Sequence, residues 1–218
     1  MTVSDYFLAN HQALVRWHPE RNGTLSPAAV SCGSHKRAWF RCDRGHEWEA
    51  LIVSVLLDGC GCPYCTGKKA LPGFNDLATQ FPEVALEWDP DRNGGRSPDA
   101  VLPSSHDRVW WQCSRGHSWQ AVIFSRTTGR PSGCPYCTGR KVLPGFNDLA
   151  ALKPKVAQEW HPTLNDTLRP TQVTPGSNKK VWWQCAAGHV WNAAIYSRTR
   201  AKGAGCPVCT GTVRRRAL

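Results

Sequence analysis

The sequence predicts a small α+β fold, arranged as three modules in tandem. The chain repeats itself at intervals of 71 and 72 residues, measured between Cys42, Cys113 and Cys185. Each repeat has a helix-like stretch followed by two stretches in which apolar and polar residues alternate. Each also contains the same pattern of three Cys and one His. We therefore expect modules at 1–73 (repeat 1), 74–145 (repeat 2) and 146–218 (repeat 3), each a β-hairpin with short helices.

Each repeat begins with signals for helices. Ser4, Asn75 and Asn147 are expected to be N-caps, because their side chains can accept a hydrogen bond from the first helical turn. Pro82 and Pro154 predict the first turn of a second short helix, since proline there loses no helical hydrogen bond. Helical spacing places one core tryptophan on this second helix in each repeat, at Trp17, Trp88 and Trp160.

Two strands are expected next in each repeat. The first strand carries a pair of aromatic residues and runs through 38–41, 109–112 and 181–184. The second runs through 47–55, 118–126 and 190–198. Because neighbours in a strand point to opposite faces, one aromatic residue of each pair can enter the core while the other faces a helix or solvent. We favour packing over base stacking as the role of these pairs.

The Cys and His pattern is the strongest chemical signal in the sequence. Each repeat has Cys-x3-His followed by Cys-x2-Cys, and three Cys with one His form a closed set of tetrahedral zinc ligands. The repetition makes disulfides or isolated thiols the weaker alternatives. We predict three structural Zn²⁺ ions per chain, bound by Cys42, His46, Cys62 and Cys65, by Cys113, His117, Cys134 and Cys137, and by Cys185, His189, Cys206 and Cys209.

The cysteine count and the N-terminal sequence indicate the compartment. Two of the 11 cysteines, Cys32 and Cys60, lie outside the three patterns. An odd count with metal-type spacing favours a reducing environment over a disulfide framework. The N-terminal sequence shows no basic segment followed by an apolar run, and no apolar stretch approaches membrane-spanning length. We expect a cytoplasmic protein, associated with the nucleoid if it is bacterial.

The formal charge of +11 indicates a polyanionic partner. Zinc binds thiolates, so three sites would lower this charge to about +8. The charge is concentrated in repeat 3, which has 11 Lys and Arg against 3 Asp and Glu. The first two repeats have 8 against 6 and 8 against 7.

Basic residues recur in the ligand turn, before the first strand and at the end of the second strand. The alternative for any one of them is ordinary solvated surface. We expect recognition of the backbone to dominate, because no long recognition helix is predicted. Arg126 and Arg198 are expected to be the main direct contacts, either to phosphate or into a groove. The predicted nucleic-acid contacts are Arg44, Arg115, Arg126, Arg130, Lys179, Lys180, Arg198, Arg200 and Lys202.

Catalysis is not expected. Four protein ligands leave no open position on the metal for a reacting water. Glu87 and Glu159 occupy equivalent positions, but repeat 1 has Arg16 there, so no general base recurs. The competing hypothesis is a protein-interaction scaffold, with repeat 1 as the partner surface. Residues 54–58 of repeat 1 read Ser-Val-Leu-Leu-Asp where repeat 2 has Ser-Arg-Thr-Thr-Gly, although these leucines could equally extend the core.

The motifs EWDPDRNG, VWWQCSRGHSWQA, SRTTG and CPYCTG of repeat 2 have counterparts through nearly the whole chain. With these motifs the sequence resembles the probable zinc-ribbon family of tandem treble-clef-like modules found in bacteria and plants. The resemblance implies zinc binding and, beyond it, nucleic-acid binding, with duplex DNA favoured over RNA. Such modules sometimes accompany nuclease domains. Repeat 1 departs from the family pattern at residues 54–58.

Overall fold

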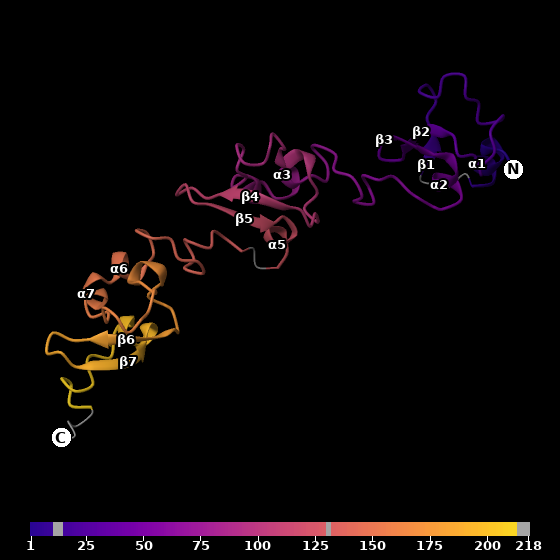
Figure 1. Ribbon diagram of the computed structural model, residues 1–218. Helices are drawn as coiled ribbons and strands as arrows, with labels where there is room; N and C mark the ends of the chain where they lie inside the picture. Colours follow the sequence, from indigo (N-terminus) through magenta and orange to yellow (C-terminus); the bar gives the residue numbers. More distant parts are fainter. Residues whose placement is uncertain (11–14, 130–131, 213–218) are drawn as a thin grey trace. The chain divides into compact units, whose positions relative to one another are not determined.

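The computed structural model describes residues 1–10, 15–129 and 132–212 (Figure 1). Contacts within this part of the chain define two units. One contains residues 1–10, 15–111 and 120–129, and the other contains residues 112–119 and 132–212. The first unit holds the metal ligands of repeat 1, and the second holds those of repeats 2 and 3.

Repeat 1 forms a three-stranded antiparallel sheet with the order β1-β2-β3. Its elements are α1 (Val3–Ala9), β1 (Val15–Trp17), β2 (Arg37–Cys42), β3 (Glu47–Leu51) and α2 (Ile52–Leu56). The inward residues of β2, Ala38 and Phe40, are buried against Ile52 and Val55 of α2. The alternation in the sequence therefore places one face of the sheet on the core.

Repeats 2 and 3 each contain a two-stranded sheet. Repeat 2 consists of α3 (Leu77–Gln80), α4 (Pro82–Ala85), the 3-10 turn η1 (Pro98–Ala100), β4 (Arg108–Gln112), β5 (Ser118–Val122) and α5 (Phe124–Thr127). Repeat 3 consists of α6 (Leu149–Leu152), α7 (Pro154–Ala157), η2 (Pro170–Gln172), β6 (Lys180–Gln184), β7 (Val190–Ala194) and α8 (Ile195–Thr199). The prolines that begin α4 and α7 confirm the predicted second helices. The α+β fold class is also confirmed.

The aromatic pairs on the first strands divide between core and surface, as expected. The second member of each pair is fully buried, at Phe40, Trp111 and Trp183. A tryptophan ring packs edge-on against each of these rings, with the two ring centres 5.5–5.8 Å apart. The three tryptophans are Trp17, Trp88 and Trp160. These three tryptophans therefore contribute to packing. The helix position predicted for them is wrong, because Trp17 lies in β1 and the other two follow α4 and α7.

The predicted N-caps are also wrong, by one or two residues. Thr2 caps α1 through a reciprocal pair of hydrogen bonds with Asp5. Asp76 caps α3 by accepting from the backbone N–H of Thr79, and Asp148 caps α6 in the same way. Asp76 and Asp148 follow the asparagines that we expected to cap these helices.

The second strand of each repeat is shorter than predicted. It ends at Leu51, Val122 and Ala194, and a helical turn follows in each repeat as α2, α5 and α8. The Arg-Thr stretches of repeats 2 and 3 therefore lie on a helical turn rather than on a strand. The boundaries of the three modules stay predictions. None of the helices in the described residues is long and apolar enough to span a bilayer.

Candidate metal centres and basic surfaces

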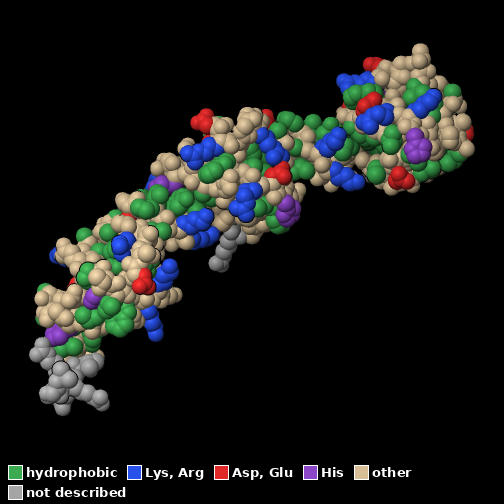
Figure 2. Space-filling view, in the orientation of Figure 1, with side chains coloured by type: hydrophobic (Ala, Val, Ile, Leu, Met, Phe, Trp, Pro, Cys, Tyr) green, Lys and Arg blue, Asp and Glu red, His purple; other side chains and the backbone are tan. Residues whose placement is uncertain are grey.

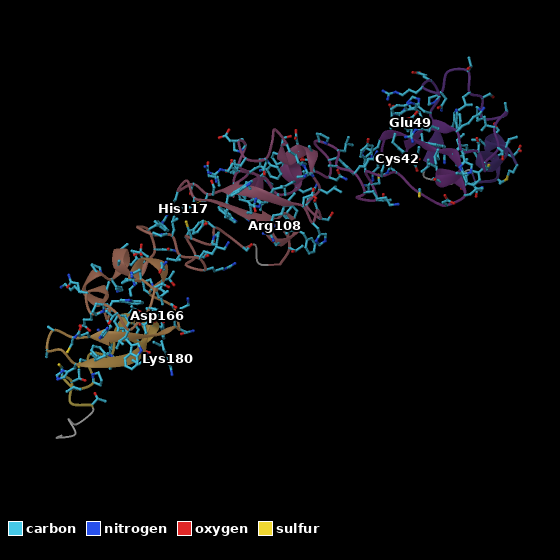
Figure 3. The ribbon with its side chains drawn as sticks, in the orientation of Figure 1. Cys42, Glu49, Arg108, His117, Asp166 and Lys180 are labelled. Atoms are coloured by element: carbon cyan, nitrogen blue, oxygen red, sulfur yellow. The ribbon has the colours of Figure 1, made fainter. Side chains whose placement is uncertain are left out.

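The structure brings together the four predicted ligands of every repeat, and the ligand atoms of each cluster lie within 4.8 Å of one another. In the cluster that contains His117, labelled in Figure 3, the Sγ atoms of Cys113 and Cys137 are 3.9 Å apart. His117 Nδ1 lies 3.3 Å from Cys137 Sγ. Tetrahedral ligands with Zn–S bonds of about 2.3 Å are separated by about 3.8 Å. The donor set therefore fits zinc, with the imidazole binding through Nδ1.

The first pair of ligands is set by a tight turn between the two strands. The backbone N–H of Cys113 donates to the carbonyl of His117 at 3.1 Å, and that of Gly116 donates to the carbonyl of Cys113 at 2.8 Å. Gly116 has a φ of +79°, a conformation that only glycine adopts without strain. The same turn recurs with Gly45 and Gly188, whose φ angles are +83° and +79°.

The second pair of ligands lies in a turn closed by threonine. In repeat 2 the backbone N–H and the hydroxyl of Thr138 both donate to the carbonyl of Cys134, each at 3.0 Å. Thr66 and Thr210 make the same two bonds in the other repeats. The Thr of the CPYCTG motif therefore orients the chain between the two cysteines.

Each cluster contains one thiol with a raised pKa and one with a lowered pKa. Burial opposes ionisation of Cys42, but the backbone N–H groups of His46 and Arg44 outweigh it and lower the pKa of this thiol. Burial and the neighbouring thiols raise the pKa of Cys65 to about 11. The pKa of Cys137 also rises to about 11 through burial and neighbouring thiols, as does the pKa of Cys209 through its hydrogen bond with Cys206 and burial. A divalent ion would compensate these adjacent negative charges, as zinc does in thiolate sites.

The segment after each of the first two clusters packs back onto the metal ligands. The ring of Phe74 lies 4.3 Å from that of His46, and Asn75 Nδ2 donates to the carbonyl of Tyr64 at 2.8 Å. The next residue, Asp76, caps α3 of repeat 2. Phe146, Asn147 and Asp148 repeat these contacts. Sequence reasoning missed this role of the asparagines, although the identical Phe-Asn-Asp segments were the available signal.

The structure contradicts the prediction that Arg126 and Arg198 contact nucleic acid directly. Their side chains are buried, with 3% and 7% of the residue surface exposed. The guanidinium of Arg126 pairs with Glu87 and lies 4.8 Å from the centre of the Trp111 ring. Arg198 pairs in the same way with Glu159. Burying an arginine requires a charged partner, so these residues belong to the interior of their repeats.

Repeat 1 lacks both members of this ion pair. Arg16 stands at the position of Glu87, and Val55, which is buried, stands at the position of Arg126. The two positions therefore change together. This paired change was visible in the sequence and could have identified the contact.

The other predicted contact residues within the described part of the chain are exposed. Arg44 and Arg115 lie in the ligand turns, each with its guanidinium 5.9 Å from the centre of a linker ring, Phe74 or Phe146. Repeat 3 has Ala187 at this position. Arg130 lies outside the described residues.

Lys179, Tyr196 and Arg200 of repeat 3 are exposed, and backbone hydrogen bonds connect their segments around α8; we call these three residues the basic corner. The exposed fraction of Tyr196 is 50%. The carbonyl of Lys179 accepts from the backbone N–H of Ile195 at 3.0 Å, and the backbone N–H of Arg200 donates to the carbonyl of Tyr196 at 3.2 Å. Lys180 and Lys202 are exposed nearby in the sequence. Figure 2 shows Lys and Arg side chains on the visible face of every repeat.

The fold and the three closed Cys3His clusters define a tandem zinc-finger protein. The family described as "Probable Treble clef zinc finger domain" matches residues 14–68, 84–140 and 156–212, so the chain belongs to this family. Three zinc sites per chain follow from these matches and from the geometry.

The chain is also similar to a protein of Escherichia phage T5 that is named "Putative endonuclease". The two are 23% identical over 107 residues, which cover 49% of this chain and 34% of the phage protein. The similar region thus spans about a third of that relative.

Proposed function

We propose that this chain is a non-catalytic, zinc-dependent nucleic-acid-binding protein that contacts the backbone through exposed Lys and Arg, with duplex DNA as its main ligand. The observation that carries the proposal is the basic corner of repeat 3, formed by Lys179, Tyr196 and Arg200. Two exposed cations on segments that are hydrogen-bonded to the helical turn of an exposed aromatic residue suit a phosphate chain that presents bases.

Comparison of repeats 2 and 3 supports a functional origin for this corner. Asp107 occupies the position of Lys179 in repeat 2, and Thr128 occupies that of Arg200. Asp107 pairs with Arg96 at 2.6 Å, so the corner of repeat 2 carries no net excess of positive charge from these residues. The scaffold is the same in both repeats, and the change of charge is confined to exposed positions.

Two features support a role without catalysis. Each metal site already has four protein ligands, as structural zinc sites do. Glu87 and Glu159, the recurring carboxylates, are held in ion pairs with buried arginines. The name of the phage relative points to nucleic acid, but the match covers only 34% of that protein. Its activity is therefore no basis for assigning catalysis here.

The test is binding of the zinc-loaded chain to a fluorescent duplex at increasing salt. Each neutralised phosphate contributes about 0.9 to the slope of log affinity against log salt. Replacing both cations, Lys179→Ala and Arg200→Ala, should lower this slope by about two. The matched control is Lys68→Ala with Lys69→Ala, which removes the same charge from exposed positions in repeat 1. An affinity of the wild-type chain that does not change between low and moderate salt would refute the proposal.

The scaffold hypothesis for repeat 1 loses most of its support. Val55 and Leu56 are buried, with 6% and 5% exposure, so they extend the core. Only Leu57 of the three apolar residues points outward, with 56% exposure. We therefore propose no second function for this repeat.

A further inference from the structure

The outer face of the β6–β7 hairpin differs from its counterparts in one respect. The first aromatic residue of the strand pair is Trp39 in repeat 1, Trp110 in repeat 2 and Trp182 in repeat 3. An arginine covers the first two rings: Arg21 lies 4.6 Å from the centre of Trp39, and Arg92 lies 4.9 Å from that of Trp110.

Leu164 replaces the covering arginine in repeat 3. Trp182 is exposed, with 39% of its surface accessible, and Leu164 is 47% exposed. The backbone of Trp182 is nevertheless fixed as in the other repeats, because its N–H donates to Asn165 Oδ1 at 2.8 Å. Repeat 3 therefore presents an ordered aromatic ring to solvent.

A hollow of about 330 Å³ lies beside this ring. Its walls include Trp182, Leu164, Asp166, Lys180 and Asn192. Asn192 is the cross-strand partner of Trp182. In repeat 1 the corresponding partner of Trp39 is a carboxylate, Glu49. The volume is at the lower end of the range for small-ligand pockets, which suits one planar group rather than a helix or a strand.

Asp166 is a second unusual feature of this hollow. It has a positive φ of 49°, whereas Gly23 and Gly94 occupy the same left-handed position in the other repeats. A positive φ is uncommon for residues other than glycine, and sparsely populated backbone conformations cluster at ligand sites. Figure 3 labels Asp166 and Lys180, which both line the hollow, and Lys180 begins β6.

We infer that this hollow binds one unpaired nucleotide of single-stranded nucleic acid, and this inference rests on the proposed function. The base stacks on Trp182 against Leu164, and its amino group donates to the carboxylate of Asp166. Lys180 meets the adjacent phosphate, which continues toward the basic corner at Lys179. Asp166 disfavours a phosphate inside the hollow and favours a base with an amino group, so cytosine binds better than thymine.

The test measures binding of the zinc-loaded chain to fluorescent oligo-dC, oligo-dT and a duplex of equal length. Trp182→Ala should weaken binding of oligo-dC about 5-fold or more and leave duplex binding within about 2-fold. Asp166→Gly restores the glycine of the other repeats without backbone strain, and it should remove the preference for oligo-dC over oligo-dT. Trp110→Ala is the matched control, because Arg92 covers that ring. Every variant must retain three zinc ions per chain.

The outcomes separate this inference from the proposed function. If the wild-type chain binds neither the duplex nor the oligonucleotides, the proposed function fails. If the duplex binds with a steep salt dependence while Trp182→Ala leaves oligo-dC binding unchanged, only the nucleotide site is refuted. Binding of heparin, a polyanion without bases, is measured as a further control. An equal loss of heparin binding in Trp182→Ala would show a general polyanion surface and would also overturn the nucleotide site.

Discussion

The buried ion pair between Arg126 and Glu87 permits a sharp test of how repeat 2 is held together. The Arg126 side chain is 4% exposed, and that of Glu87 is 29% exposed. Glu87→Ala would leave a buried guanidinium without its carboxylate. Breaking a fully buried pair in this way costs about 3–5 kcal/mol. Because Glu87 is partly open to solvent, we expect about 2–3 kcal/mol.

The reference for this cost is a double variant. Adding Arg126→Met to Glu87→Ala removes the stranded charge while keeping apolar volume beside Trp111, which lies 4.8 Å from the guanidinium. Replacement of a buried ion pair by apolar residues is often neutral. The double variant should therefore return to within about 1 kcal/mol of the wild type. Repeat 1, with Val55 and Arg16 at these positions, shows that the fold tolerates the absence of the pair.

Hydrogen exchange measured by mass spectrometry is the suitable assay, because a chain with several modules need not unfold in one step. Amides of β4 and β5 should exchange about 30- to 140-fold faster in Glu87→Ala than in the wild type. Repeat 3 keeps its own ion pair between Arg198 and Glu159 in both variants, so the β6–β7 hairpin serves as the internal control. If Arg126→Met adds to the cost of Glu87→Ala, the pair is not coupled and the reasoning fails.

Three further predictions concern the metal, a helix cap and the basic corner. Chelation of zinc should abolish the near-ultraviolet circular dichroism of the tryptophans, because structural zinc contributes on the order of 10 kcal/mol to the folding free energy of small domains. An unchanged spectrum after complete removal of zinc would contradict this prediction. Asp76→Ala should cost about 1 kcal/mol and deprotect the amide of Thr79. Hydrogen bonds from Thr79 and Gly73 outweigh burial and lower the pKa of Asp76, so its stabilisation is complete above the usual carboxylate pKa and is lost only as pH falls through the lowered value. The cost should thus be equal at pH 6 and pH 8, and a difference would refute it. Asp107→Lys with Thr128→Arg should strengthen duplex binding and raise its salt slope by transferring the basic corner to repeat 2, and unchanged binding would argue against that corner.

The metal centres could be predicted from the sequence because their ligands lie in two short motifs per repeat. Cys113 and His117 lie within one turn, and a closed Cys3His set has few other uses. The strands were predictable for a similar reason, since alternation with period two is visible in any short window. The helical turns after the strands were not, because Phe124 and its neighbours continue the same apolar alternation.

The role of the conspicuous arginines could not be read from the sequence. Arg126 lies 39 residues from Glu87, and neither local spacing nor net charge reveals such a pair. Charge alone made Arg126 a candidate for a phosphate, although burial decides its partner. The only sequence signal was the joint replacement by Arg16 and Val55 in repeat 1.

The three repeats can be compared as natural variants of one scaffold. Residues that hold the scaffold recur in all of them, such as the asparagines that accept from the strand tryptophans at 2.7–2.8 Å. Several residues that face solvent around this scaffold differ between the repeats. Repeat 1 places Glu49 opposite its strand tryptophan, and repeat 3 places Asn192 there and leaves Trp182 uncovered. The hydrogen bonds that hold the strand tryptophans do not account for these differences, because they are the same in the three repeats. Under the proposed function, the uncovered Trp182 and the basic corner favour repeat 3 as the main binding module.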